Sequence, residues 1–180
     1  MPPAPRLVPD AALPPYSYVP GRFPHPVRDP RGHHHGAVPV PVAAPDPTDW
    51  PASRAYLQAL DLFNHGYYWE AHEEWEGLWH ACGRRGTTAD FLKGLIKLAA
   101  AGVKVREGQP RGVLSHARGA AALFAKTAQA VGGEDRRYLG LSLRDLLTFA
   151  RQVEDQAADA VGDKDEGVKV VFDFVLWPSD

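Results

Sequence analysis

Apolar residues recur at steps of three and four over most of the chain beyond residue 49. This spacing places them on one face of an α-helix and so predicts amphipathic helices. Glycine-containing breaks interrupt the pattern, and glycine readily adopts the left-handed φ with which helices commonly end. The predicted helices cover about 49–64, 68–81, 87–108, 110–131 and 141–160. The sequence therefore predicts an all-α fold, a compact bundle of about five helices.

The helix predicted over 87–108 is apolar around most of its circumference, which is typical of a helix at the centre of a bundle. Its small residues should let neighbouring helices approach closely. Three lysines form one narrow strip along it: Lys93, Lys97 and Lys104. Because lysine is rarely buried, this strip is expected to be a solvated edge. A sharper alternative places Lys97 opposite Glu73 or Glu76, in an acid–base network or an anion site.

The two ends of the chain differ from the predicted helices. Fifteen of the 17 prolines lie in residues 1–51, where they exclude helix interiors and central strands. The last residues, VKVVFDFVLWPSD, are rich in β-branched and aromatic side chains. A single strand finds no sheet partner in a helical domain, so these residues are expected to pack on the bundle or on a second chain. We therefore expect an N-terminal arm over 1–48, partly packed on a helical domain over 49–162, and an extended tail over 163–180.

Charge and composition exclude several classes of partner. The net charge of −2 and the scattered basic residues argue against a nucleic-acid partner. No apolar run is long enough to span a bilayer, and the start of the chain lacks a signal-peptide segment. The single cysteine, Cys82, cannot form an internal disulfide. A soluble, cytoplasmic protein with no membrane partner is therefore expected.

The segment YYWEAHEEWEGLWH, residues 67–80, holds most of the candidate chemistry. At about 100° per residue, its apolar side chains form one core-facing stripe, and His72, Glu73 and Glu76 continue directly from that stripe. Glu70 and Glu74 point the other way and are expected to face solvent. His72 and Glu76 stand four residues apart, within mutual reach, and are predicted to meet in a shielded niche.

Three interpretations of this pair remain open: a structural His–Glu contact, a divalent metal site, or proton transfer without a metal. The zinc-protease pattern fails, because Glu76 stands where a second histidine is required. The di-iron pattern fails too, because Trp69 precedes His72 by three residues. One ion cannot bind His72, Glu76 and His80 together, since the outer two lie roughly 12 Å apart along the helix. The metal-ligand candidates are therefore His72, Glu76 and His116, with the arm residues His25, His33, His34 and His35 as further sources.

Residues 62–124 resemble the bacterial and archaeal family called domain of unknown function 309. The motif residues shared with it are Phe63, Asn64, Gly66, Tyr68, His72, Glu73, Glu76 and Trp79, followed by Gly94, Leu95, Ile96, Ala99, Ala100 and Gly108. Gln109 departs from the asparagine that is commoner there. The resemblance implies a compact all-α domain and no particular reaction. It also implies that any site contains His72, Glu73 and Glu76, with Trp79 as a wall and Asn64 shaping the preceding turn.

Three functional hypotheses follow. The first is a helical binding or scaffold module for a small ligand or a protein, with a polar pocket partly covered by the arm and formed by Asn64, Tyr68, His72, Glu73, Glu76, Trp79 and Lys97. The second is a metal-dependent, hydrolase-like enzyme with His72 and Glu76 as ligands and Glu73 as general base. The third is a structural homo-oligomer that uses the apolar tail.

Overall fold

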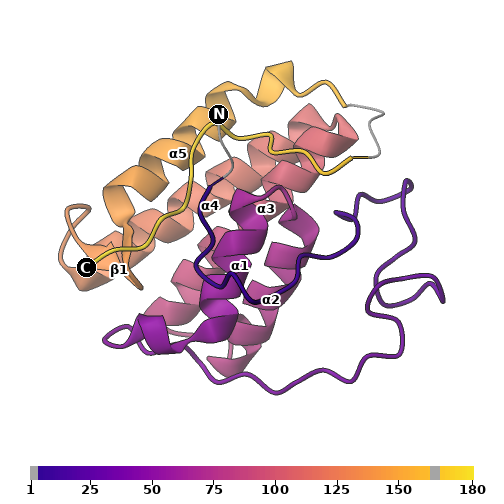
Figure 1. The fold of residues 1–180 in the computed structure, drawn as a ribbon. Coiled ribbons are helices and arrows are strands. Elements are labelled where there is room, and N and C mark those ends of the chain that lie inside the picture. Colours follow the sequence, from indigo (N-terminus) through magenta and orange to yellow (C-terminus); the bar gives the residue numbers. More distant parts are fainter. Residues whose placement is uncertain (1–3, 163–166) are drawn as a thin grey trace.

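The computed structural model describes residues 4–162 and 167–180. Over these ranges the fold is built from five α-helices, shown in Figure 1: α1 (Arg54–Asn64), α2 (Tyr68–Ala81), α3 (Thr87–Glu107), α4 (Pro110–Val131) and α5 (Leu143–Asp155). The predicted all-α bundle with an extended arm and tail is confirmed. The expected boundary between bundle and tail falls at 163–166, outside the described residues.

Helix α3 lies at the centre, packed against α2 on one side and α4 on the other. Its glycines permit this. A Cβ at Gly94 would lie 2.5 Å from the Phe124 ring of α4, and one at Gly102 would lie 2.6 Å from the Tyr68 ring of α2. The small residues noted in the sequence are therefore the points at which aromatic rings of both neighbours touch the α3 backbone. Helices α1 and α5 complete the bundle by packing on α2 and α4 respectively.

The start of α5 differs from the prediction. A two-residue hairpin, β1 (Arg137–Tyr138) paired antiparallel with β2 (Leu141–Ser142), precedes the helix. Leu139 and Gly140 form the turn with positive φ at both positions, which is the backbone of a tight hairpin. Ser142 then caps α5, its hydroxyl accepting from the Asp145 amide at 3.2 Å. Two short 3-10 turns, η1 (Trp50–Ala52) and η2 (Ala157–Asp159), replace the outer ends predicted for the first and last helices.

The C-terminal segment, residues 167–180, crosses the bundle in extended conformation and ends near β1 (Figure 1). The Asn64 side chain binds both backbone groups of Leu176, donating to its carbonyl at 2.9 Å and accepting from its amide at 2.8 Å. The Tyr68 hydroxyl accepts from the Val171 amide at 2.9 Å. The Phe174 ring stacks on Phe149 of α5 with centroids 4.2 Å apart. Much of the segment's apolar surface is therefore used within its own chain.

The N-terminal arm also makes buried contacts with the helices. The fully buried Asp61 carboxylate of α1 accepts from the Leu7 and Val8 amides, both at 2.8 Å, and from Arg6 Nε at 3.0 Å. Residues 16–35 then form a loop with hydrogen bonds among its own residues. In one of them the Tyr16 hydroxyl donates to the Pro24 carbonyl at 2.8 Å. Beyond this loop the chain runs along the surface, where Val38 and Val40 are more than 80% exposed.

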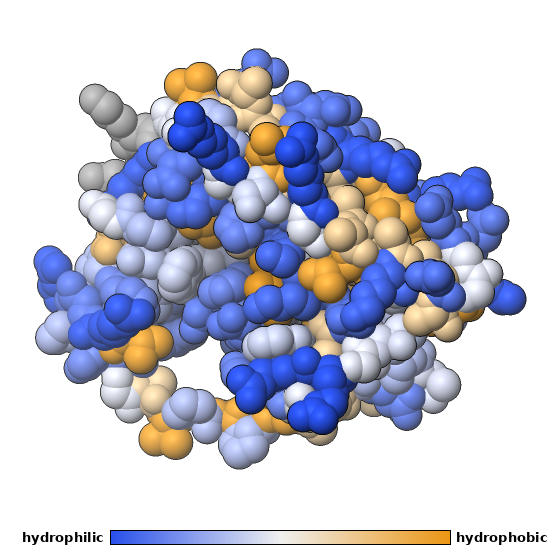
Figure 2. Space-filling view, turned by 180° about the vertical axis from the view of Figure 1, so that it is seen from behind, coloured by the Kyte–Doolittle hydropathy of each residue, from blue (hydrophilic) through white to orange (hydrophobic). Residues whose placement is uncertain are grey.

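One face of the molecule is mainly polar. Figure 2 shows a face dominated by hydrophilic residues with apolar ones scattered among them. Across residues 4–162 and 167–180, no helix has both the length and the apolar character that crossing a bilayer requires.

Candidate metal centre on α2

His72, Glu73 and Glu76, here called the α2 cluster, lie where the buried stripe of α2 meets solvent. Ala71, Trp75 and Leu78 are buried, as the helical periodicity predicts. The exposed fraction of the side chain is 18% for His72, 35% for Glu76 and 46% for Glu73. The shielded niche expected for His72 and Glu76 is therefore a half-buried edge that stays open to water.

The orientation of the His72 ring is set by the main chain of its own helix. Its Nδ1 lies 3.3 Å from the Trp69 carbonyl oxygen, a contact in which Nδ1–H donates. The ring also packs beside the Trp69 indole, with centroids 5.2 Å apart. The second nitrogen, Nε2, points to Glu76 Oε2 at 3.7 Å. This separation is longer than a hydrogen bond between nitrogen and oxygen.

The other Glu76 oxygen faces a cation on α3. Lys93 Nζ lies 4.0 Å from Glu76 Oε1 and 4.2 Å from the centre of the Trp79 ring. The Trp79 ring thus makes a cation–π contact with this lysine. Lys93, and not the predicted Lys97, is the lysine that reaches the α2 cluster. Lys97 instead lies along α4.

His116 enters from α4. Its pKa is lowered, first by burial and then by the positive charges of Lys97, Lys104 and His72. Its Nδ1 is buried and has no hydrogen-bond partner among the described residues. His116 therefore shares the electrostatic environment of His72, although it is not one of the residues whose ligand atoms converge.

The α2 cluster has the spacing of a metal-ligand set. One ligand atom from each residue lies within 4.8 Å of the others. His72 Nδ1 lies 3.6 Å from Glu73 Oε1, and His72 Nε2 lies 3.7 Å from Glu76 Oε2. Two atoms bound to one ion with bond lengths of about 2.1 Å lie roughly 3 to 4 Å apart. Within the described ranges, these three residues are the group of histidine, cysteine, aspartate or glutamate side chains that lie close enough together to hold a metal ion. His72 Nε2 and Glu76 therefore have a separation that fits a divalent ion, and Glu73 joins them as a third ligand if its side chain rotates toward Nε2.

Two residues expected in the pocket lie elsewhere. Asn64 and Tyr68 are buried beneath the C-terminal segment and are engaged with its backbone. Tyr68 is 1% exposed, and burial raises the pKa of its hydroxyl well above the ordinary value. Both residues therefore hold the C-terminal segment in place and do not line a site with His72.

Glu70 was expected in solvent, and this prediction is wrong. Glu70 is only 3% exposed because the arm covers it. Oε1 accepts from the Tyr18 amide at 2.9 Å and lies 3.7 Å from His33 Nε2. Burial is the main cause that raises the pKa of Glu70 to about 7, and burial likewise lowers the pKa of His33 to about 4. Glu74 is also partly buried, and desolvation raises its pKa. The aromatic residues of the arm indicated that the arm covers part of a helix, but they did not indicate which helix surface it covers.

The remaining arm histidines do not join the α2 cluster. His25 Nδ1 accepts from the Val27 amide at 3.2 Å, and His35 Nδ1 contacts the Val27 carbonyl at 2.9 Å. His34 packs against the His33 ring. His25 does approach the site through Trp69, whose ring lies 5.8 Å from His25 and 5.2 Å from His72. The arm thus shields one side of the Trp69 ring.

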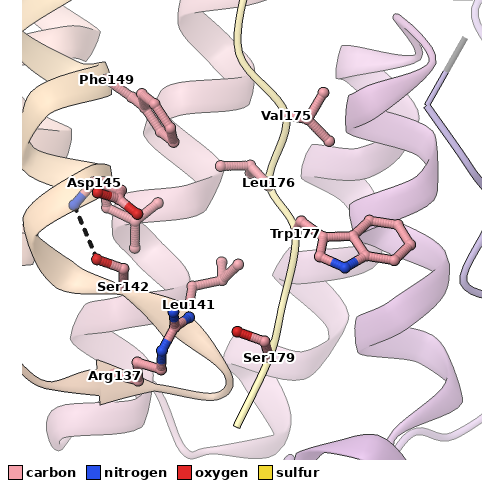
Figure 3. A pocket seen from close by; sticks show the side chains of 10 residues that line it. Arg137, Leu141, Ser142, Asp145, Phe149, Val175, Leu176, Trp177 and Ser179 are labelled. Carbon is pink, nitrogen blue, oxygen red and sulfur yellow. Dashed lines mark hydrogen bonds between the residues drawn. The ribbon is translucent and has the colours of Figure 1, made fainter.

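A hollow of about 160 Å³ lies away from the α2 cluster, between α5 and the C-terminal segment (Figure 3). Leu141, Phe149 and Leu176 form its apolar part, and Arg137, Asp145 and Ser179 line its polar part. Within it, the Ser142 hydroxyl accepts from the Asp145 backbone amide as the cap of α5. This hollow is a seam where the C-terminal segment docks.

Comparison with known proteins agrees with the sequence resemblance. The family model described as Domain of unknown function (DUF309) matches residues 56–115. The match contains the α2 cluster and ends one residue before His116, and it includes neither the arm nor the C-terminal segment. Searches of the curated proteins and of the solved structures found no match. Residues 56–115, which form most of α1, all of α2 and α3 and the start of α4, are thus similar to the DUF309 family, and this match supports the resemblance found in the sequence.

Proposed function

We propose that this protein is a helical binding module that holds a divalent metal ion in the α2 cluster. The observation that carries the proposal is the orientation of His72. A neutral imidazole that donates from Nδ1 has its lone pair on Nε2, and this nitrogen points at a Glu76 carboxylate oxygen. Two electron-rich atoms face each other favourably only when a cation lies between them.

The backbone contact of His72 supports the same role. Histidine ligands usually donate their second ring N–H to a carbonyl or carboxylate, which fixes the tautomer and the direction of the ligating nitrogen. The Trp69 carbonyl provides this contact, and packing on the Trp69 ring restricts the ring further. His72 is therefore preoriented before any ion binds.

A proton on Nε2 is the other cation that fits between His72 and Glu76. It gives the second candidate, a binding module in which the two side chains form a structural ion pair. The 3.7 Å separation favours the metal, because N–H···O hydrogen bonds are normally 2.7–3.2 Å long. Glu73 Oε1 lies 3.6 Å from Nδ1, on the other side of the ring, so an imidazolium with a proton on each nitrogen also faces one carboxylate from each side, and the long separation between Nε2 and Glu76 is what distinguishes the two candidates.

The donor set indicates the class of ion. One imidazole with two carboxylates suits zinc, manganese or another divalent transition metal. The exposure of Glu73 and Glu76 leaves room for water at the remaining positions. In this arrangement Glu73 is a ligand. A hydrolase that used Glu73 as its general base would retain only two ligands from the chain, so the geometry supports metal binding ahead of hydrolysis.

Calorimetric titration of tag-free protein with Zn²⁺ and with Mn²⁺ tests the proposal. We expect one site per chain in the wild type and loss of that site in His72→Ala. His80→Ala is the matched control, because His80 lies on the same helix but is exposed and outside the cluster. Binding that survives His72→Ala and disappears when His34 and His35 are replaced would assign the ion to the arm and refute the proposal.

A further inference from the structure

A partly exposed strip runs along α3, the helix that packs against both α2 and α4. Lys93, Lys97, Ala100 and Lys104 form this strip and are all partly exposed. Lys93 pairs with Glu76, and Lys104 Nζ lies 2.8 Å from Glu107 Oε2. Lys97 differs from both, because it has no ion pair with any residue in the described part of the chain. A partly buried ammonium group without a counter-charge is unusual.

The backbone of α4 is shaped to receive the lysines. A Cβ at Gly112 would lie 2.9 Å from Lys104 Cγ and Cδ, and a Cβ at Gly119 would lie 2.7 Å from Lys97 Cδ and 3.2 Å from Lys97 Nζ. The two side chains therefore lie across α4 at two glycines, and His116 stands between those glycines in the sequence. Three cationic or proton-donating groups are gathered on this face.

His116 adds an unused polar atom to the same place. Its Nδ1 is buried and has no hydrogen-bond partner among the residues described. After burial, the charge of Lys97 is the next largest cause that lowers the pKa of His116. A buried polar atom without a partner costs free energy unless a ligand or water satisfies it.

We propose that Lys97 and His116 bind a small oxyanion, a carboxylate or phosphate group, which also contacts the metal ion held by the α2 cluster. This inference rests on the proposed metal site. Lys97 supplies the charge, His116 supplies a hydrogen bond, and the ion neutralises the carboxylates of Glu73 and Glu76 that would otherwise repel an anion. Anion binding therefore depends on the metal, and the two sites are coupled.

The chemistry explains why the occupant is an oxyanion. The ammonium group of Lys97 and the metal ion attract negative charge, and the imidazole of His116 supplies a hydrogen bond. The face is half-open, so the anion is either a free ion or the terminal group of a larger molecule. Ala100 lies on the same strip, and its small side chain leaves the middle of the strip unobstructed.

The test uses Mn²⁺-loaded full-length protein and two probes, inorganic phosphate and ¹³C-labelled acetate. A bound anion in contact with Mn²⁺ has a strongly broadened ³¹P or ¹³C resonance, so the readout reports binding beside the metal. Lys97→Gln should weaken anion binding by about tenfold or more, since it removes one charged hydrogen-bond donor, and should leave Mn²⁺ binding intact. Lys126→Gln is the control, because this α4 lysine is exposed and paired with Asp90 at 2.8 Å. A larger effect on phosphate than on acetate would identify a phosphate group as the preferred ligand, and the reverse would identify a carboxylate.

The outcomes separate this inference from the metal proposal. If the wild type binds Mn²⁺ but broadens neither probe, or if Lys97→Gln broadens them as the wild type does, the anion site is refuted and the metal site stands. If Mn²⁺ does not bind at all, the proposed function fails and the anion inference fails with it. Equal loss of anion binding in Lys97→Gln and Lys126→Gln would indicate a general charge effect and would also refute the inference.

Discussion

Replacing Asp61 with asparagine should detach the start of the N-terminal arm. The Asp61 carboxylate is fully buried and accepts three hydrogen bonds from the arm, one at Oδ1 and two at Oδ2. An asparagine keeps one acceptor and turns the other into an NH₂ group. Because both oxygens face donors, either orientation of the amide sets an N–H against another N–H. Arg6 also loses its buried counter-charge.

The expected loss follows from these contacts. Hydrogen bonds to a charged group contribute about 1.5–3 kcal/mol each, and removing one partner of a buried pair costs about 3–5 kcal/mol. We expect Asp61→Asn to lower the free energy of unfolding by about 3 kcal/mol, since the arm can undock and regain hydration. Urea denaturation measures the loss, and limited proteolysis should show earlier cleavage within residues 4–20.

Asp10→Asn is the matched control. Asp10 pairs with Arg54 of α1 at 2.8 Å, but both side chains are more than half exposed. Exposed ion pairs contribute little to stability, so this variant should unfold much like the wild type. If Asp61→Asn were no less stable than Asp10→Asn, the arm would not be held by buried hydrogen bonds, and the description of it as an integral part of the fold would be refuted.

Three further variants test other contacts. Asn64→Ala removes both hydrogen bonds to Leu176 and should cost about 1–3 kcal/mol of unfolding free energy, with the C-terminal segment becoming protease-sensitive; an unchanged cleavage pattern would contradict this. Gly94→Ala drives a Cβ to 2.5 Å from the Phe124 ring and should destabilise by about 1–3 kcal/mol, whereas Gly77→Ala meets only an ordinary 3.6 Å contact and should be neutral or stabilising in the same thermal melt. Glu70 gains a proton on folding between its ordinary pKa of 4.5 and about 7, while His33 loses one between 6.5 and about 4, so in the wild type their contributions to stability nearly cancel. In Glu70→Gln the contribution of His33 is no longer offset, so the free energy of unfolding in chelator should rise more steeply from pH 4 to 6.5 than in the wild type. A profile for Glu70→Gln that is no steeper than the wild-type profile, measured by urea denaturation at several pH values, would contradict the burial of this pair.

The helices could be predicted from the sequence because their signals are local. Helix α3 ends at Gly108 and α4 at Gly132, both with left-handed φ, and the small residues of α3 indicated close helix packing. The wheel of α2 also placed His72, Glu73 and Glu76 side by side. These features depend on residues at most a few turns apart, for which periodicity and glycine conformation are sufficient guides.

The misplaced residues depend on contacts between distant segments. Glu70 is buried by Tyr18, which precedes it by 52 residues, and Asn64 is bonded to Leu176, which follows it by 112. A helical wheel treats any surface not facing its own stripe as solvent, so it could not reveal that an arm covers Glu70. The β1–β2 hairpin was missed because two-residue strands have too little alternation to distinguish them from the start of a helix.

The metal-to-protein ratio of native, tag-free protein tests the central claim most directly. Purified without chelator and dialysed against metal-free buffer, the wild type should retain close to one divalent transition metal per chain by elemental mass spectrometry. His72→Ala and Glu76→Gln should lose it, while His80→Ala keeps it. A wild type with no bound metal that also fails to take up Zn²⁺ or Mn²⁺ on reconstitution, or a ratio that is equal in the wild type and His72→Ala, would contradict the assignment of the α2 cluster as a metal site.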